Sequence, residues 1–338
     1  MKLNTTMKLN LLAVAMLSVM LTPLYGVDKT IGSSAPAAQT NKDKGDAPSP
    51  AADKKAEELI QAIKDKNTER ATKLINEGAN VNFLNKADAN NSPLMYAVVQ
   101  DDAAVAELLL NKGAELEQKN SRGETALAQS ALSSRARMCK LLISRGADVN
   151  TTYWDGWTPI VIAARYGNLE IVKMLIDAGA DKDYNGGKAI AKTLEFNQLA
   201  ALKLLLDSGA KPNAGLVNWS IKKGKDYIKL MLDHGAKVNL KDGNGETPLV
   251  CAAGGKDKSI VKLLLKHGAK VNLQSKDGTT ALMKATQSGN FAIVEMLLKA
   301  GANPTIRNDK GETALDLANS DPVKQILSEA FNRRKGKK

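Results

Sequence analysis

The sequence predicts an all-α solenoid of helix–turn–helix units with β-hairpin fingers, and two observations support this fold class. A leucine-rich run followed by Gly-Ala recurs along the chain, and the steps between these glycines are 35, 33, 33, 30, 26, 33 and 33 residues. Such a period indicates stacked units, each of which buries its apolar face against its neighbours. Aromatic residues make up only 4% of the chain, which suits thin layers filled by aliphatic side chains. The repeated pairs are Gly78-Ala79, Gly113-Ala114, Gly146-Ala147, Gly179-Ala180, Gly209-Ala210, Gly235-Ala236, Gly268-Ala269 and Gly301-Ala302.

The first 26 residues are typical of a cleaved export signal. Lys2 and Lys8 precede an apolar run over residues 11–21. Its length fits a signal-peptide core of about 7–15 residues and falls short of the roughly 20 residues that span a bilayer. We therefore expect a signal peptide over 1–26 and a periplasmic or secreted protein; an uncleaved membrane anchor is the alternative.

Composition divides the rest of the chain into a linker, an array of repeats and a tail. Residues 27–54 are rich in Ser, Ala, Pro and Lys and hold almost no large apolar side chain, so we expect a disordered linker. Apolar residues at helical spacing then predict a repeat array over 55–331. It opens with a cap of two short helices that are broken around residues 65–67. A basic tail follows at 332–338.

The unit over residues 155–181 is the best preserved and predicts each of its elements. Asp155-Gly156 predicts a tight turn, and Thr158 can cap the next helix with Pro159 in its first turn. Gly167 ends this first helix. Gly179 ends the second helix in a left-handed conformation. The unit is therefore two antiparallel helices with a protruding hairpin.

This unit resembles the ankyrin repeat. The same pattern recurs as Gly245-Glu-Thr-Pro-Leu-Val-Cys-Ala-Ala, Gly278-Thr-Thr-Ala-Leu-Met-Lys-Ala, Gly311-Glu-Thr-Ala-Leu-Asp-Leu-Ala, Gly123-Glu-Thr-Ala-Leu-Ala-Gln-Ser and Ser92-Pro-Leu-Met-Tyr-Ala. The resemblance implies about eight units, the two caps included. It also implies that a partner protein binds in a concave groove formed by the hairpin tips and the first helices.

Two units depart from this pattern. The hairpin over 180–190 is about three residues short, and the hairpin over 210–216 is about seven short, judged against the usual spacing. We therefore expect a notch in the row of fingers. The alternative is that these two repeats are merely decayed.

The formal net charge of +12 favours anionic partners. Export argues against nucleic acid, so acidic proteins, lipid headgroups or wall polymers rank higher; simple solvation of the surface by Lys is the alternative. The basic tail could touch anionic headgroups weakly, at about 1 kcal/mol for each basic residue near such a surface. A solvated, frayed terminus is the favoured interpretation of this tail.

Little in the sequence predicts chemistry. His234 and His267 both precede the Gly-Ala pair of their unit, so they are copies of one repeat position. No cluster of His, Cys and carboxylates with zinc-ligand spacing is visible. Cys139 and Cys251 lie too many repeats apart to form a disulfide, and we expect both to be small buried hydrophobes. We predict no catalytic residue, no metal and no cofactor.

The candidate partner-binding residues gather on one finger. Interface hot spots favour Trp, Tyr and Arg, because a large rigid surface is desolvated there at modest entropic cost. Trp219 falls in the notch, where filling the gap is the favoured interpretation, and Trp157 could instead pack on the adjacent finger. The predicted contact residues are Tyr153, Trp154, Asp155 and Trp157 at the tip, Arg165 and Tyr166 behind it, Arg122 and Glu124 on the preceding finger, and Trp219.

These observations predict a non-enzymatic, exported, monomeric protein that binds a partner protein through the concave groove. A secreted effector that acts on a host protein is one alternative. An enzyme with a site in the notch is another, and it predicts a pocket of convergent carboxylates around Tyr184, Glu195 and Asp226.

Overall fold

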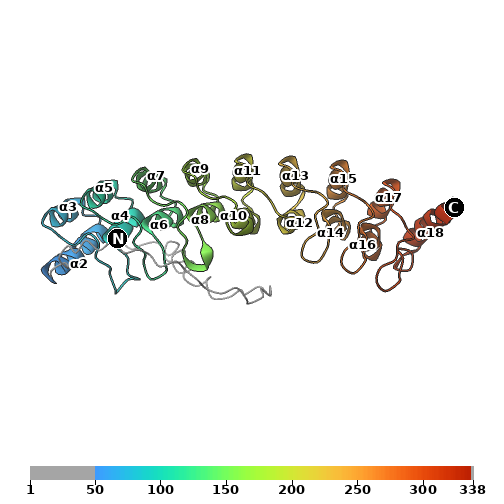
Figure 1. Ribbon diagram of the computed structural model, residues 1–338, viewed down its shortest axis with the longest axis horizontal. Coiled ribbons are helices and arrows are strands. Elements are labelled where there is room, and N and C mark those ends of the chain that lie inside the picture. Colours follow the sequence, from blue (N-terminus) through green and yellow to red (C-terminus); the bar gives the residue numbers. More distant parts are fainter. Residues whose placement is uncertain (1–49, 336–338) are drawn as a thin grey trace, which may run out of the picture. The chain divides into compact units, whose positions relative to one another are not determined.

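The computed structural model describes residues 50–335 and places them in two rows of helices (Figure 1). Each unit before the last contributes one helix to each row. In Figure 1 the first helices form the lower row and the second helices the upper row. The first helices are α2 (Pro50–Lys64), α4 (Pro93–Gln100), α6 (Ala126–Leu132), α8 (Pro159–Tyr166), α10 (Tyr184–Glu195), α12 (Ala214–Lys223), α14 (Pro248–Ala253) and α16 (Ala281–Gln287). The second helices are α3 (Thr68–Asn76), α5 (Ala103–Asn111), α7 (Ala136–Ser144), α9 (Leu169–Asp177), α11 (Leu199–Asp207), α13 (Lys225–Asp233), α15 (Lys258–Lys266) and α17 (Phe291–Lys299).

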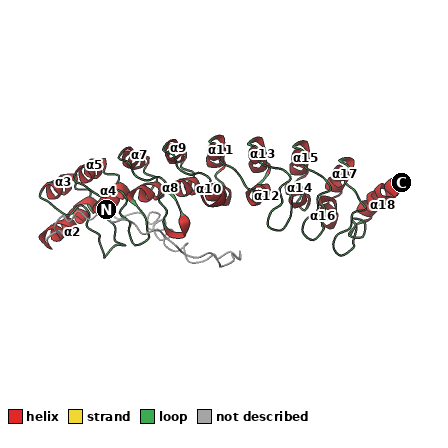
Figure 2. Ribbon diagram, in the orientation of Figure 1, coloured by secondary structure: helices red, strands yellow, loops and turns green. Residues whose placement is uncertain are grey.

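The predicted all-helical solenoid is confirmed. Each first helix packs on its own second helix and on the first helices of the neighbouring units, and the second helices pack along their own row in the same way. Within the described residues the fingers contain isolated bridges instead of regular strands, and the finger before α8 also holds one 3-10 turn, η1 (Trp154–Gly156). Figure 2 shows this turn as helix and the other fingers as loops. These bridges pair Asn85 with Asn91, Tyr153 with Trp157, and Gln274 with Thr280.

The ends of the array extend beyond the predicted boundaries. Helix α2 begins at Pro50, inside the range 27–54 that composition assigns to the linker. Helix α18 (Asp321–Lys335) packs on α17 and continues into the predicted tail. The first helix of this last unit is reduced to a turn around residues 314–317. The remaining linker residues, the signal peptide and residues 336–338 lie outside the described part of the chain.

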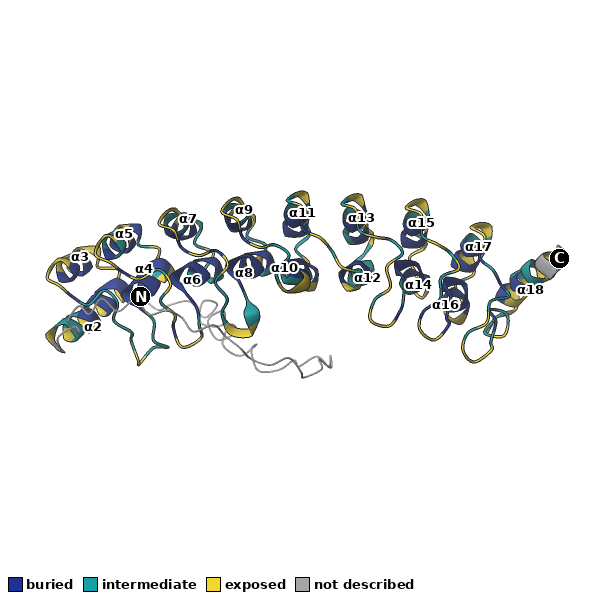
Figure 3. Cartoon of the chain, in the orientation of Figure 1, coloured by how far each residue is buried: buried dark blue, intermediate teal, exposed yellow. Residues whose placement is uncertain are grey.

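The apolar core faces inward between the two rows (Figure 3) and divides into two clusters at α12 and α13. Leu216 and Met231 belong to the cluster formed by the N-terminal units. Val217, Ile228 and Leu232 belong to the cluster formed by the C-terminal units. Neighbouring side chains of the same two helices thus pack in opposite directions, so this position is a seam in the core.

The shortened repeats lack fingers. The chain passes from Ala210 to α12 through three residues, and Asn213 caps that helix by accepting a hydrogen bond from the backbone N–H of Leu216 at 3.0 Å. In the preceding unit Asn185, Gly186 and Gly187 take left-handed conformations before the regular turns of α10 begin. Fingers therefore precede α8 and α14 but are missing before α10 and α12 (Figure 1).

The cap expected at Thr158 is absent. Ser92, Thr125, Thr247 and Thr280 each accept a hydrogen bond from a backbone N–H in the first turn of the following helix. Thr158 occupies the same position before α8, with Pro159 in the first turn, but its side chain makes no such bond. Its hydroxyl oxygen is buried without a partner. The expected capping bond was therefore wrong, while the expected helix start was right.

Adjacent fingers pack backbone against backbone, which makes the turn residue Gly278 sensitive to substitution. Its φ is +74°, and a Cβ there would lie 2.9 Å from Asn308 Cα and 2.9 Å from the backbone nitrogen of Asp309. Gly311 has a similar φ of +78° with no atom within 4 Å of its Cβ position. We expect Gly278→Ala to lower the free energy of unfolding by about 3 kcal/mol, from left-handed strain plus the clash. Gly311→Ala, which incurs the strain alone, should cost about 1 kcal/mol. Urea denaturation of both variants measures the difference, and equal losses would show that the fingers separate without cost.

Candidate functional site

The finger over residues 153–157 is a tight hairpin that sorts its two tryptophans into different environments. The N–H of Tyr153 donates to the carbonyl of Trp157 at 3.0 Å, and Asp155 and Gly156 turn the chain with positive φ. Trp154, at the tip, is 75% exposed. Tyr153 and Trp157 are half-buried and pack against the N-terminal core cluster, with their ring centroids 6.3 Å apart. The finger thus holds one free indole above one packed indole.

Three cations from two units surround the Trp157 ring. Lys192 Nζ lies 4.8 Å from its centroid, Lys188 Nζ 5.8 Å, and Arg165 Cζ 5.3 Å. A cation over the face of an indole is attracted by the ring quadrupole, more strongly when water is excluded. The side chains of Lys188 and Lys192 are only 14% and 20% exposed, so these two cations are largely desolvated.

Arg165 stacks within an aromatic cage. Its guanidinium lies 4.5 Å from the ring centroid of Phe196 on α10 and 5.5 Å from that of Tyr166 on its own helix, in addition to Trp157. Tyr166 is 46% exposed and Phe196 37% exposed, so both rings also face solvent. We call Trp157, Arg165, Tyr166, Lys188, Lys192 and Phe196 the aromatic–basic cluster. It brings the predicted residues behind the finger together with three residues of the next unit.

The charges of this cluster are unequally paired. Lys188 lies 3.3 Å from a carboxylate oxygen of Asp155 and also donates to its backbone carbonyl, and Lys192 lies 2.7 Å from Glu195. Among the described residues, no carboxylate contact accompanies the stacking of Arg165. The N–H donors of this guanidinium are therefore not engaged in an ion pair within the described part of the chain.

The remaining predicted contact residues lie apart from this cluster. Arg122 is exposed on the preceding finger, and Trp219 is half-buried against the N-terminal core cluster. Glu124 is only 5% exposed; it accepts hydrogen bonds from the side-chain amides of Asn120 at 2.8 Å and Gln129 at 2.6 Å. A contact role for Glu124 is therefore corrected to a structural one, because this carboxylate is occupied at the base of its finger.

Sequence reasoning missed Lys188, Lys192 and Phe196, although a register signal exists. Asn197 has a left-handed φ of +58° and ends its helix as Gly167 does at +66°. When the two units are aligned on these residues, Phe196 occupies the repeat position of Tyr166. Aligning Asn197 with Gly289 in the same way makes Lys192 equivalent to Lys284. Lys284 forms an ion pair with Glu246 of the preceding unit, with 3.1 Å between Nζ and the carboxylate oxygen. Glu246 and Trp157 also occupy equivalent positions, each immediately before a Thr at the start of a helix. The lysine at one repeat position therefore contacts the residue before this Thr in the preceding unit in both cases.

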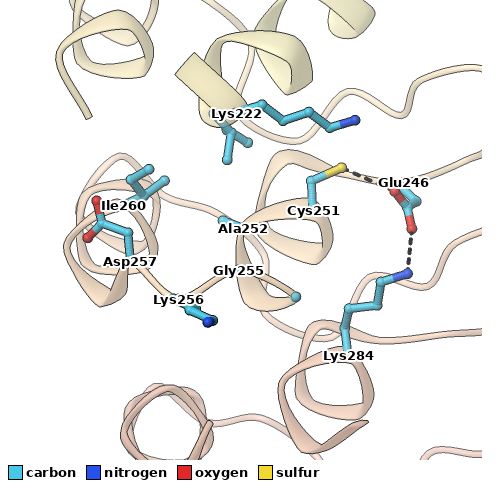
Figure 4. Close-up of a pocket in the computed structure, with 11 residues that line it drawn as sticks. Lys222, Glu246, Cys251, Ala252, Gly255, Lys256, Asp257, Ile260 and Lys284 are labelled. Atoms are coloured by element: carbon cyan, nitrogen blue, oxygen red, sulfur yellow. Dashed lines mark hydrogen bonds and ion pairs between the residues drawn. The ribbon is translucent and has the colours of Figure 1, made fainter. Parts of the chain in front are cut away.

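A second polar group gathers at the base of a later finger (Figure 4). The donor atoms of Asp242, Glu246 and Cys251 all lie within 4.8 Å of one another, a set that sequence spacing did not reveal. Each donor already has a partner. Asp242 accepts from the backbone N–H groups of residues 244 and 246 and from the amide of Asn218. Glu246 accepts from the Cys251 thiol at 3.2 Å and pairs with Lys284. This group is a closed hydrogen-bond network, and we assign no metal to it.

Neither cysteine is a nucleophile at neutral pH. Both are free thiols. Burial raises the pKa of Cys139 to about 11, and burial together with the Glu246 carboxylate raises the pKa of Cys251 to about 12. Cys139 is buried as expected, whereas Cys251 is half-buried beside an open hollow of about 420 Å³ lined by Lys222, Lys256 and Lys284 (Figure 4). A thiolate rather than a thiol is the reactive form, so this hollow offers no thiol chemistry.

The three polar residues of the enzyme alternative have separate surroundings. Glu195 pairs with Lys192, and the Tyr184 hydroxyl lies close to the turn at Gly156. Asp226 is exposed in the first turn of α13. The hollow beside Cys251 is lined by other residues. This arrangement therefore adds no support to a catalytic site in the notch.

His234 makes a pH-sensitive link between two units. Its Nδ1 lies 2.9 Å from the carbonyl oxygen of Leu230, and its Nε2 lies 2.8 Å from a carboxylate oxygen of Asp207. Both partners are acceptors, so both ring nitrogens donate only when the imidazole is protonated. The hydrogen bond to Leu230 and then that to Asp207 raise the pKa of His234 above 6.5, against desolvation and the nearby Lys203 ammonium.

We expect the stability that His234 contributes to be fully present below pH 6.5 and to be lost as the pH rises through its raised pKa. The measurement is the urea midpoint of the wild type and of His234→Ala at about pH 5.5 and about pH 8.5. The urea midpoint of the wild type should exceed that of His234→Ala by less at the higher pH than at the lower. Asp207→Asn weakens the hydrogen bond from His234 Nε2. In that background, the urea midpoints with and without His234 should differ less. An advantage that grows with pH would contradict this assignment.

A match to a protein-family model agrees with the repeat architecture. A family model described as ankyrin repeats (3 copies) matches residues 59–153, 150–215, 217–308 and 256–332. A probable E3 ubiquitin-protein ligase, XBOS32, from Oryza sativa subsp. japonica is 34% identical over 74 residues, which are 22% of this chain and 15% of the rice protein. The crystal structure of the ankyrin repeat domain of Bcl-3, a member of the IkappaB protein family, is 26% identical over 70% of this chain and 98% of that domain, with a TM-score of 0.42.

Among the described residues, no helix is both long enough and apolar enough to cross a membrane. The predicted signal peptide over 1–26 lies outside these residues.

Proposed function

Because the chain belongs to the ankyrin-repeat family, we propose that it is a non-enzymatic module that binds a partner protein through its finger tips and first helices. The observation that carries this proposal is the exposure of Trp154 beside the aromatic–basic cluster. The Trp154 indole is 75% exposed in the folded chain, so folding removes little of its apolar surface from water and contributes little hydrophobic free energy at this position. Covering it with a partner would recover that free energy.

The composition of this surface supports the same proposal. Interface hot spots are enriched in Trp, Tyr and Arg and lie where neighbouring contacts exclude water. Trp154, Arg165 and Tyr166 are all on or next to one finger. The missing fingers before α10 and α12 leave the next unit without a hairpin beside this surface, so a partner can reach Lys192 and Phe196 from that flank.

We further propose that the protein acts outside the cytoplasm, as the predicted signal peptide over 1–26 indicates. It would then be a periplasmic or secreted scaffold, inhibitor or protector. A secreted effector that acts on a host protein is the second candidate, and it would be favoured if the chain were recovered outside the cell. A monomeric state and a weak contact of the basic tail with anionic surfaces stay predictions. Within the described part of this tail, Arg333 pairs with Glu329 at 3.0 Å.

The test is affinity capture from an extract of cells that naturally make the protein, using Trp154→Ala/Tyr166→Ala. The matched control is Leu169→Ala/Phe291→Ala, which removes two exposed apolar side chains from the start of α9 and of α17 in the second row. We expect at least a tenfold loss of the captured protein with the first pair and little change with the second, as for a hot spot worth 1.4 kcal/mol or more. Equal recovery with both pairs would refute binding through this surface.

A further inference from the structure

We propose that the aromatic–basic cluster recognises a carboxylate side chain in an acidic segment of the partner protein, and that Arg165 is the residue that binds it. This inference rests on the proposed function and names the chemistry of the partner. It follows from three features of the cluster: a stacked guanidinium, two desolvated lysines and an exposed aromatic rim.

The stacking of Arg165 leaves its donors available. Rings of Trp157, Tyr166 and Phe196 lie 4.5–5.5 Å from the guanidinium carbon, and no carboxylate among the described residues pairs with the group. The N–H bonds of a guanidinium lie in its plane and form a fork that matches the two oxygens of a carboxylate. Stacking also fixes the side chain before binding, so less conformational entropy is lost when the carboxylate arrives.

The lysines make the local charge positive where water is partly excluded. Lys188 and Lys192 are mostly buried, whereas the carboxylate side chains that neutralise them, on Asp155 and Glu195, are 73% and 43% exposed. Around the Trp157 ring, three cations therefore face two carboxylates that are screened by solvent. Charge–charge attraction is several-fold stronger at low dielectric than in water, so an incoming anion is attracted to the cluster.

The aromatic rim selects a peptide over a small anion. Tyr166 stands exposed beside Arg165, and Trp154 stands exposed at the tip of the finger whose Trp157 ring Arg165 contacts; both offer apolar area that a free anion or a single headgroup would leave uncovered. A segment with one or more Asp or Glu residues next to apolar side chains would cover both parts of the surface. The positive net charge of the chain would steer such a segment toward it.

The test lets the folded chain choose its own ligand. A displayed library of random 12-residue peptides is selected on the immobilised wild-type protein, and enriched peptides are synthesised together with counterparts in which Gln replaces Glu and Asn replaces Asp. Their dissociation constants are measured with the wild type and with Arg165→Gln/Lys188→Gln/Lys192→Gln. The matched control is Lys258→Gln/Lys262→Gln/Lys266→Gln, which removes the same charge from exposed positions on α15.

We expect the enriched peptides to be acidic, and we expect the first triple variant to weaken their binding at least tenfold. The matched triple and the wild type should agree within about twofold, since distant surface charges act only through screened fields. Arg165→Lys, which keeps the charge but loses the planar fork, should fall between them. Circular dichroism spectra of all variants should superimpose on that of the wild type. If the first triple variant does not fold, two measurements still test the inference. Arg165→Lys must bind the acidic peptides more weakly than the wild type does, and the wild type must bind their Gln- and Asn-substituted counterparts more weakly.

Each contrary outcome identifies what fails. Neutral peptides that lose binding to Trp154→Ala/Tyr166→Ala, but not to the first triple, would overturn the acidic-segment inference and leave the proposed function standing. Peptides indifferent to both variants would overturn both proposals. A third outcome is that no peptide is enriched and that vesicles of phosphatidylglycerol and phosphatidylcholine are bound only by proteins that keep Arg165. This result would assign the cluster to anionic lipid instead and overturn the inference.

Discussion

Leu264→Ala should unfold the C-terminal units first and leave the N-terminal units folded. Leu264 is fully buried in the middle of α15, and truncating such a leucine lowers the free energy of unfolding by about 2–5 kcal/mol. In repeat proteins a unit interacts only with its neighbours, so a local loss spreads across an interface only as far as that interface is strong. The seam at α12 and α13 divides the apolar core, and we expect the loss to stop there.

The three tryptophans of the chain make this measurable. Trp157 and Trp219 both pack against the N-terminal core cluster, and Trp154 stands on a finger of the same units. Tryptophan fluorescence therefore reports the N-terminal units, while far-ultraviolet circular dichroism reports all helices. In urea, Leu264→Ala should move the dichroism transition to lower concentration and change the fluorescence transition little.

Leu175→Ala is the matched control, because Leu175 is fully buried and lies four residues before Gly179, as Leu264 lies four before Gly268. This variant should move the fluorescence transition. If Leu264→Ala shifts both signals equally, the array unfolds as one cooperative unit and the seam has no energetic meaning.

Trp157→Ala should destabilise the protein far more than Trp154→Ala, although the two residues are on the same finger. Trp157 packs against the core and lies under three cations, so its loss should lower the free energy of unfolding by about 2 kcal/mol. Trp154 is exposed, and its truncation should change stability by no more than about 0.5 kcal/mol. Thermal unfolding of the two variants provides the comparison.

The direction of each effect tests the roles of the two indoles. A large stability loss with Trp154→Ala would mean that the finger tip packs onto another part of the chain and is not free for a partner. A negligible loss with Trp157→Ala would mean that the cations around its ring contribute no stabilisation.

The second helices and the ends of the units were predictable from local chemistry. A left-handed residue is needed where each second helix stops, and Gly179 and its equivalents provide it with φ near +86°. Trp154 is exposed, and its role in binding stays a prediction; Trp219 packs against the core, as expected of a residue that fills the notch. These outcomes depend on one residue and its immediate neighbours along the chain.

Sequence reasoning failed for one local network, for one capping bond and for a set of contacts between units. Glu124 is buried because Asn120 and Gln129 enclose its carboxylate, and Thr158 lacks its expected capping bond, for which we find no structural reason. Lys192 contacts the Trp157 ring and Phe196 contacts the Arg165 guanidinium, but Asn197 replaces the usual glycine after their helix and hides the register. The cage around Arg165 thus combines side chains whose proximity no spacing rule predicted.

The most direct test of the central claim is site-specific photocrosslinking in cells that naturally make the protein. Benzoylphenylalanine replaces Trp154 in one variant and Phe291, an exposed aromatic at the start of α17, in the other. We expect a discrete crosslinked partner protein from position 154 after irradiation and none of that species from position 291. The same crosslinked species from both positions, or crosslinks from position 291 alone, would contradict binding through the finger at Trp154.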